Sequence, residues 1–440
     1  MLRRILPGAA ASALGDGMSA VAIAWLALRL APDPASRGLW VGAAVAAYSL
    51  PGAAGAVVLR RLLGARSGAR LAFVNAVLRA VTLGLIGCLA IAGLLDPVGY
   101  VALLGVSSIL SAWGIAGKYT LIAEVLPAEH RVAGNTVFGL ADQLSLMIGP
   151  ALAGVLTAVA GPAVVIAADA ASWALLAASY ALLSHSPPGA LDASPSLLAR
   201  SSLVSPGDAA PFGSRETPRP PAAPPGAWAV IRSSPVLPGL LAMSFVFYLL
   251  YGPVEVALPV HVAADLHGSA ALLGTFWAVF GVGAVIGELS APFLRRWRVW
   301  PTMTWIVLGW GLALIPLGLR TPLWAALAAF FAGAVIWGPW MSLSMGVLQD
   351  ASPPAALAAV IAARSSLLIV AAPLGTALGG PLVTALGARG TLLASALATV
   401  ALGLVTVAVL AAGRRRHARH EPGAVRETIA RSAETSTSQG

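Results

Sequence analysis

Residues 390–412 read GTLLASALATVALGLVTVAVLAA, an apolar stretch without a single charged side chain. As an α-helix rising 1.5 Å per residue, this stretch reaches about 35 Å, more than the roughly 30 Å hydrocarbon core of a bilayer. Inside lipid, backbone N–H and C=O groups are satisfied only in helices or closed barrels. Because polar and apolar residues do not alternate here, the stretch predicts a transmembrane helix.

Comparable apolar stretches recur along nearly the whole chain. The sequence of 440 residues is 58% hydrophobic and only 10% charged, with a mean hydropathy of +0.85. That is too little charge to cover a soluble protein of this size. We therefore predict an all-α membrane protein with twelve spans, six at 6–30, 39–59, 71–95, 99–121, 135–158 and 162–183, and six at 236–263, 268–292, 301–319, 322–348, 357–384 and 390–412.

Several classes of protein are excluded by composition. The net charge of +10 is scattered through short loops, unlike the basic face of a nucleic-acid-binding protein. The lone Cys88 lies in an apolar stretch and provides neither a disulfide nor a cysteine metal site. The only lysine, Lys118, has Ala112 where a phosphate-binding loop needs its first glycine. We expect no cofactor, no metal, no nucleic-acid partner and no ATP-driven transport.

The arginines predict the orientation of the chain. If the N-terminus is cytoplasmic, the outer side holds only Arg29, Arg37, Arg320 and Arg389, and the other arginines of the loops lie inside. We therefore predict a multi-pass protein of the bacterial inner membrane with both termini in the cytoplasm. The preference for arginine over lysine, with abundant alanine, is typical of a GC-rich bacterial genome.

The predicted spans fall into two sets separated by a polar connection. Residues 184–235 are rich in proline, serine and glycine, and predict a disordered cytoplasmic linker in which AWAVIRSSP forms a short interfacial helix. The predicted domains are a six-helix bundle at 1–183, this linker, a second six-helix bundle at 236–413, and a disordered cytoplasmic tail at 414–440.

An internal repeat supports two related halves. The segment Gly52–Arg61 (GAAGAVVLRR) aligns without gaps on Gly287–Arg296 (GELSAPFLRR), and Gly149-Pro150 corresponds to Ala372-Pro373. Transporters built from repeated helical halves hold their substrate between the repeats near the middle of the membrane. The repeat therefore favours a transporter with a central site.

These features resemble the major facilitator superfamily over essentially the whole chain. The resemblance lies in LGDGMSAVAIAWLALRL at 14–30, IGPALAGVL at 148–156 and GPVEVALPVHV at 252–262, and is narrower with the exporters of enterobactin and macrolides. It implies the major facilitator fold, two pseudo-symmetric six-helix bundles, and alternating access. The sequence departs from the family at Leu59, where the loop signature has an acidic residue, and at Ser145, where span five has a glycine.

Ionisable residues inside spans are the first candidates for function, because each costs roughly 2.5–3.5 kcal/mol on insertion. Asp16 lies near the middle of span one, which by resemblance lines the central cavity. The proton-coupling candidates are therefore Asp16 and Asp142. An alternative role for Asp16 is helix packing, since Gly15 and Gly17 permit close approach of a neighbouring span.

The remaining charges suggest gates or structural pairs. Asp142 and Arg364 take equivalent places in the two halves, and form either a relay at the inner gate or separate pairs, such as Asp142 with Arg79. Glu288 lies within reach of arginines at the inner end of span eight. The gating or charge-pair candidates are Arg79, Arg364, Glu255, Glu288, Arg60 and Arg295.

Two further groups complete the candidate site. Aromatic side chains in spans 7 and 10 provide an apolar surface for a substrate, or alternatively pack between helices. The substrate-cavity candidates are Gln143, Tyr251, Trp337 and Trp340. The predicted helix-bend motif consists of Gly149, Pro150, Gly154 and Pro373.

The function we predict is a monomeric secondary active transporter, not an enzyme. By resemblance it exports a small lipophilic molecule, such as a drug, siderophore or secondary metabolite, in exchange for protons. One alternative is a non-transporting scaffold or signalling protein on the same fold. The other is a membrane-embedded transferase, which needs polar catalytic residues at one membrane face, whereas the long loop here is proline-rich.

Overall fold

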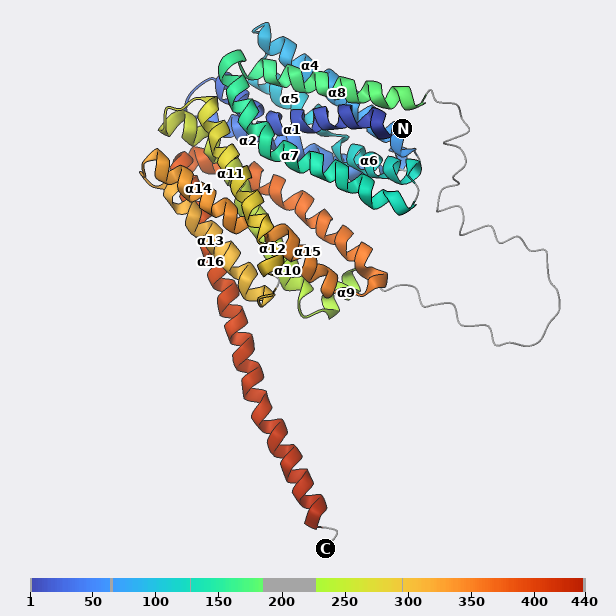
Figure 1. The fold of residues 1–440 in the computed structure, drawn as a ribbon. Helices are drawn as coiled ribbons and strands as arrows, with labels where there is room; N and C mark the ends of the chain where they lie inside the picture. Colours follow the sequence, from blue (N-terminus) through green and yellow to red (C-terminus); the bar gives the residue numbers. More distant parts are fainter. Residues whose placement is uncertain (1, 64–65, 127, 185–226, 295, 438–440) are drawn as a thin grey trace, which may run out of the picture.

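Two groups of helices make up the molecule, which is seen here in a computed structural model. The structure describes residues 2–63, 66–126, 128–184, 227–294 and 296–437. The first group holds α1 (Leu2–Leu30), α2 (Arg37–Val58), the short α3 (Arg60–Leu63), α4 (Gly68–Ile91), α5 (Pro97–Ser108), α6 (Ser111–Val125), α7 (Ala128–Ala160) and α8 (Pro162–Ser184). Figure 1 shows these helices, blue to green, on one side of the molecule.

The second group holds the remaining helices, drawn yellow to red in Figure 1. They are α9 (Ala227–Ser233), α10 (Leu237–Val260) with a π-helical turn η2 (His261–Asp265), α11 (Ala270–Leu289), α12 (Ala291–Leu294), α13 (Val299–Gly318), α14 (Leu323–Trp337), α15 (Trp340–Asp350) and α16 (Pro354–Thr437). The short α9 coincides with the segment predicted to form an interfacial helix, and in it Ile231 is buried while Trp228 is 57% exposed.

The helices confirm the predicted fold class. Ten stretches of the described residues are long and apolar enough to cross a membrane. The stretch at 363–412 contains two helices, because Gly387 breaks α16 with a φ of 73°, a left-handed conformation that glycine adopts without strain. The α7 helix adds the predicted fifth span, with an apolar part at Ile148–Ala160. Each of the twelve predicted spans thus lies on one helix or on consecutive helices, as with α5 and α6 in span four and α14 and α15 in span ten.

Glycines allow the closest helix contacts in each half. A Cβ on Gly17 of α1 would collide with the Ser145 backbone of α7, and one on Gly149 would lie 2.7 Å from Gly17 Cα. In the second half, a Cβ on Gly252 of α10 would collide with Gly375 of α16. Gly17 and Gly252 lie 235 positions apart, which is the offset of the internal repeat. The two halves therefore use the same small-residue contact between their first and fifth spans.

The repeated segment itself forms a second equivalent contact. A Cβ on Gly52 of α2 would lie 3.0 Å from the Ser108 carbonyl oxygen at the end of α5. A Cβ on Gly287 of α11 would lie 3.1 Å from Gly338 Cα at the end of α14. Both glycines thus join the second span of their half to the fourth, which explains why the repeat is visible in the sequence.

Contact between the halves is closest at the end that holds the α1–α2 and α7–α8 connections. There α2 packs against α16 and α7 against α11. A Cβ on Gly42 would lie 2.8 Å from Gly380 Cα, and one on Gly154 would lie 2.7 Å from Gly274 Cα. The N-terminus lies at the opposite end (Figure 1). The molecule is therefore closed between the halves at the end predicted to face outward.

The segments outside the bundles bear differently on the predicted domains. Most of the predicted linker, residues 185–226, lies outside the described residues. The tail at 414–440 was predicted to be disordered, whereas the structure continues α16 as a helix to Thr437, projecting away from both bundles (Figure 1). Its Ala, Arg and Glu residues have high helix propensity, which the prediction from polarity alone did not weigh.

Candidate functional site

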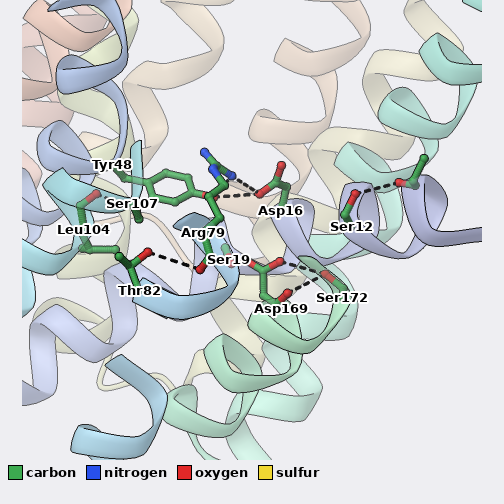
Figure 2. A network of polar contacts seen from close by, with 11 residues as sticks. Ser12, Asp16, Ser19, Tyr48, Arg79, Thr82, Leu104, Ser107, Asp169 and Ser172 are labelled. Atoms are coloured by element: carbon green, nitrogen blue, oxygen red, sulfur yellow. Dashed lines mark hydrogen bonds and ion pairs between the residues drawn. The ribbon is translucent and has the colours of Figure 1, made fainter. Parts of the chain in front are cut away.

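An ion pair between α1 and α4 forms the centre of the first bundle. The Arg79 Nη1 atom lies 2.6 Å from the Asp16 Oδ1 atom. The Tyr48 hydroxyl of α2 donates to the same carboxylate oxygen at 2.9 Å and accepts from Arg79 Nη1 at 3.0 Å. Figure 2 shows the three side chains facing one another. Three helices thus place one carboxylate, one guanidinium and one phenol in mutual hydrogen-bonding contact.

Aromatic rings hold the arginine on two sides. The Arg79 guanidinium carbon lies 4.9 Å from the centre of the Tyr48 ring and 4.8 Å from that of Trp173 on α8. Stacking of this kind stabilises a desolvated cation. The Arg79 side chain is only 8% exposed, whereas that of Asp16 is 40% exposed. The arginine is therefore fixed, and the carboxylate is the accessible member of the pair.

A second carboxylate lies next to this pair. Asp169 of α8 is fully buried and accepts hydrogen bonds from Ser19 of α1 and, at 3.3 Å, from Ser172 (Figure 2). A Cβ on Gly15 would collide with the Asp169 carboxylate, so Asp169 lies against the backbone that carries Asp16. The glycine before Asp16 thus serves the helix packing that the sequence suggested as the alternative.

The charges of this centre do not balance by themselves. One guanidinium compensates one carboxylate, but Asp16 and Asp169 provide two. Burying an uncompensated charge is strongly unfavourable, and two nearby carboxylates are readily accommodated when they share one proton. With both carboxylates ionised, these three side chains alone carry one net negative charge, which one proton would neutralise.

A cavity of about 130 Å³ adjoins Asp16. Its walls come from α1, α4, α6, α7 and α8, all helices of the first bundle. The residues with polar side chains that line it are Ser12, Asp16, Asn75, Arg79, Ser111, Lys118, Trp173 and Tyr180. The ion pair thus lies at one end of a pocket within a single bundle.

In the second bundle, the predicted charges have neutral partners. Glu255 of α10 accepts a hydrogen bond from Thr376 of α16 at 3.3 Å. Arg364 is 3% exposed and donates to Ser344 at 2.9 Å and to the sulfur of Met341 at 3.7 Å. Among the described side chains, no carboxylate forms an ion pair with Arg364.

For Glu288, the structure describes only one of the two neighbouring arginines, because Arg295 lies outside the described residues. Glu288 accepts a hydrogen bond from Ser342 of α15, and no ion pair joins it to Arg296. It lies beside a second, more open cavity of about 530 Å³ between α11, α12 and α15. Arg79 likewise has Asp16 as its partner, where the sequence suggested Asp142 as an example.

The aromatic candidates are divided among three contacts of the second bundle. Trp340 is fully buried and stacks on Phe247 with ring centres 4.7 Å apart. Trp337 packs on Phe280 at 5.4 Å. The third candidate, Tyr251, packs on Trp310 at 6.1 Å. These contacts place the aromatic side chains in helix packing in this conformation.

Other candidates are partly or wholly beyond what the structure describes. The side chains of Asp142, Gln143 and Arg60 lie outside the described residues, as does all of Arg295. The α7 and α16 helices continue through Pro150 and Pro373. Within the described part of the chain, no group of three His, Cys, Asp or Glu side chains is placed to hold a metal ion.

Sequence reasoning missed the residues that complete the centre. Tyr48 and Trp173 were not singled out, because aromatic residues in spans are most often packing residues. Asp169 of predicted span six was not among the candidates, and the structure shows it fully buried.

Removing the cation should destabilise the first bundle. Replacing Arg79 with methionine keeps the volume but leaves the carboxylates uncompensated, so we expect a loss of about 3 kcal/mol in the free energy of unfolding. Thermal unfolding in detergent measures it. The double variant Arg79→Met/Asp16→Asn removes the pair and should recover much of the melting temperature. A double variant no more stable than the single one would contradict a charge-based explanation.

Comparison with known proteins agrees with the fold. The model of the Major Facilitator Superfamily matches residues 5–367. The multidrug efflux pump Tap of Mycolicibacterium fortuitum is 25% identical over 412 residues, which cover 92% of this chain and 94% of that protein. Tap of Mycobacterium tuberculosis (strain ATCC 25618 / H37Rv) is 32% identical over 161 residues, which cover 36% of this chain and 38% of that protein.

Solved structures share the fold at low sequence identity. A bacterial homologue of the human lysosomal transporter Spinster superimposes with a TM-score of 0.66 and 13% identity, covering 92% of this chain and 95% of that one. A bacterial homologue of the iron transporter ferroportin gives a TM-score of 0.66 and 13% identity, covering 92% and 98%. At such identities the likeness concerns the fold alone.

Proposed function

Because this chain belongs to the major facilitator superfamily, and is thus a multi-pass secondary transporter and not an enzyme, we propose that it exports small lipophilic molecules in exchange for protons. The observation that carries this proposal is the centre at Asp16. A half-exposed carboxylate contacts a fixed guanidinium at 2.6 Å, with a second carboxylate buried beside it. Such a centre binds one proton and releases it when its surroundings change.

Protonation of Asp16 changes the contacts that hold α1. The neutral acid no longer attracts Arg79 as an ion, so the link between α1 and α4 weakens. Arg79 then compensates the negative charge of the neighbouring Asp169. We propose that this exchange accompanies rocking of the two halves. A membrane potential of 100 mV supplies roughly 2.3 kcal/mol for each charge moved, and any pH gradient adds to it.

The direction and the cargo rest on similarity to the Tap pumps. The M. fortuitum relative is a multidrug efflux pump and aligns with 92% of this chain, which supports export of varied small molecules from a bacterial cell. The narrower likeness to enterobactin and macrolide exporters stays a prediction. With the N-terminus in the cytoplasm, the closed contact between the halves lies outside, so this conformation would take up cargo from the cell interior.

Other charged residues are proposed for the gates. Arg364 is a buried cation whose described partners are neutral, which suits a group that meets an acid only after the halves move. We propose Asp142 as a second proton-coupling residue, and Glu255 and Glu288 as groups that respond to the same movement. Glu255 and Glu288 each accept a hydrogen bond from a single hydroxyl group, and such a bond is easily exchanged.

Accumulation in a bacterial host that lacks its own efflux pumps tests the proposed function. We expect cells that make this protein to hold less tetraphenylphosphonium or other lipophilic dyes than cells with an empty vector. A protonophore should remove the difference, since it dissipates the driving force. If correctly inserted protein changes the level of no compound in a broad lipophilic panel, a non-transporting membrane protein becomes the better explanation.

A further inference from the structure

We propose that the cavity inside the first bundle is a water-filled passage that carries protons between Asp16 and the membrane face at which α1 begins. This inference rests on the proposed role of Asp16. It adds a route for protons that lies within one bundle and is separate from the path of cargo between the two halves.

The position of the cavity carries the first step of the argument. It is lined along α1 by Ala9, Ser12, Ala13 and Asp16, in one continuous row from the N-terminal part of the helix to the ion pair. The lining residues of α4 follow the same course to Arg79, and α6, α7 and α8 close the other sides. No described lining residue belongs to the second half. A passage of this kind would persist while the halves move relative to each other.

Buried polar atoms without partners carry the second step. Three side chains that line the cavity, Asn75, Arg79 and Trp173, are at most 8% exposed. Among the residues that the structure describes, the Asn75 Oδ1, Arg79 Nε and Trp173 Nε1 atoms have no hydrogen-bond partner. Buried polar atoms are almost always hydrogen-bonded, to protein or to ordered water. One acceptor and two donors on side chains that line a common cavity thus lack described partners, which favours water molecules beside them.

The size of the cavity fits such a water chain. A volume of about 130 Å³ is several times the roughly 10–15 Å³ that one water molecule requires. A buried water needs two to four polar partners, and Ser12, Ser111 and Tyr180 add hydroxyl groups to those near the ion pair. Cavities that stay empty are lined by apolar side chains alone. This lining is mixed, so hydration is favoured.

A chain of hydrogen-bonded waters gives the proton a path. At the end farther from that membrane face, the water chain reaches Asp16, whose side chain is 40% exposed. Toward the other end, Lys118 lies on the wall. The passage lies within the first bundle, whereas cargo is proposed to move between the two halves. Proton and cargo would thus reach the transporter by different routes.

Cysteine labelling tests whether water reaches the cavity. In a Cys88→Ser background, Ser12→Cys places a thiol on the cavity wall, and Ser107→Cys is a matched control. Both serines are at most 5% exposed, and each donates to the carbonyl three residues earlier, Ser12 at 3.1 Å and Ser107 at 2.7 Å. Only Ser12 lines the cavity. Should Ser12→Cys fail to fold, Ala13→Cys lies on the same wall.

The probe is 2-aminoethyl methanethiosulfonate applied to inside-out membrane vesicles. Thiols react as thiolates, which need water, so we expect modification of Ser12→Cys to be at least about tenfold faster than that of Ser107→Cys. Equal, slow modification of both would overturn the passage. This readout needs no transported compound, so it stands apart from the failure of the proposed export.

Infrared spectroscopy tests the proton path itself. The carboxyl signal that Asp16→Asn removes should follow a pH jump more slowly once Ser12→Cys is modified, because the attached group displaces the waters. The modified Ser107→Cys protein, obtained after prolonged exposure, should respond as the unmodified one does. An Asp16 signal that follows the jump equally fast in the modified Ser12→Cys protein would show that protons arrive by another route.

Discussion

Export of tetraphenylphosphonium driven by a pH gradient is expected to disappear when Asp16 is replaced by asparagine. Asparagine keeps the size of the side chain and its contact with Tyr48, but it cannot bind or release a proton at Oδ1. Exchange of cargo across the membrane without a gradient requires no net proton movement and should continue. Proteoliposomes measure both: uptake after a pH jump, and counterflow of labelled against unlabelled cargo at equal pH.

The matched control for this variant is an acid outside the spans. The Ser36 backbone N–H donates to Asp33 at 2.8 Å, and this hydrogen bond holds the pKa of that carboxyl below its usual range. Asp33 is therefore ionised throughout the working pH range and carries no proton in transport. Asp33→Asn should keep gradient-driven transport. Gradient-driven uptake by Asp16→Asn at the normal rate would remove Asp16 from the mechanism.

A disulfide across the closed end of the molecule is expected to stop transport completely. The Cα atom of Leu39 on α2 lies 3.3 Å from the Cβ that Gly380 of α16 would carry. The two Cα atoms are therefore closer than the upper limit of about 6.8 Å for residues joined by a disulfide. In a Cys88→Ser background, oxidised Leu39→Cys/Gly380→Cys locks the two halves together at this end. Cargo transport should fall to background and return after reduction with dithiothreitol.

Each single cysteine variant serves as the control for the lock. Either alone leaves the halves free to separate, so oxidant should not change its transport. The cross-link itself is seen by protease cleavage within the 185–226 connection, after which only the disulfide holds the two halves together in an electrophoresis gel. Full transport by the cross-linked protein would mean that this end does not open, and alternating access would be wrong for this chain.

The lock and the Asp16 variant probe different parts of the mechanism. The disulfide prevents movement of the halves and should abolish both driven transport and counterflow. Asp16→Asn should abolish only the driven component. A protein that loses both activities in both variants would place Asp16 in the cargo path as well, instead of in proton coupling alone.

The sequence by itself determined the membrane class, the twelve spans and the two related halves. These properties follow from the transfer of single side chains between water and lipid, which is summed along a local stretch and needs no knowledge of the neighbouring helices. The repeat was revealed by the constant spacing of 235 residues between matching positions such as Gly52 and Gly287. The sequence also identified Asp16 and Arg79 as functional candidates, because a charged side chain inside a membrane span is energetically unfavourable.

The tertiary structure alone decided which charges meet. Asp16, Tyr48, Arg79 and Asp169 belong to four helices, and their contact depends on how those helices cross and rotate. Glycines set these distances: Gly15 admits Asp169, and Gly17 admits α7. A helix presents a different side chain every 100° of rotation, so small differences in packing change the partner of a buried charge. Hydropathy carries no information about the rotation of a helix around its axis. The pairing of Arg79 with Asp16 is therefore visible only in the folded bundle.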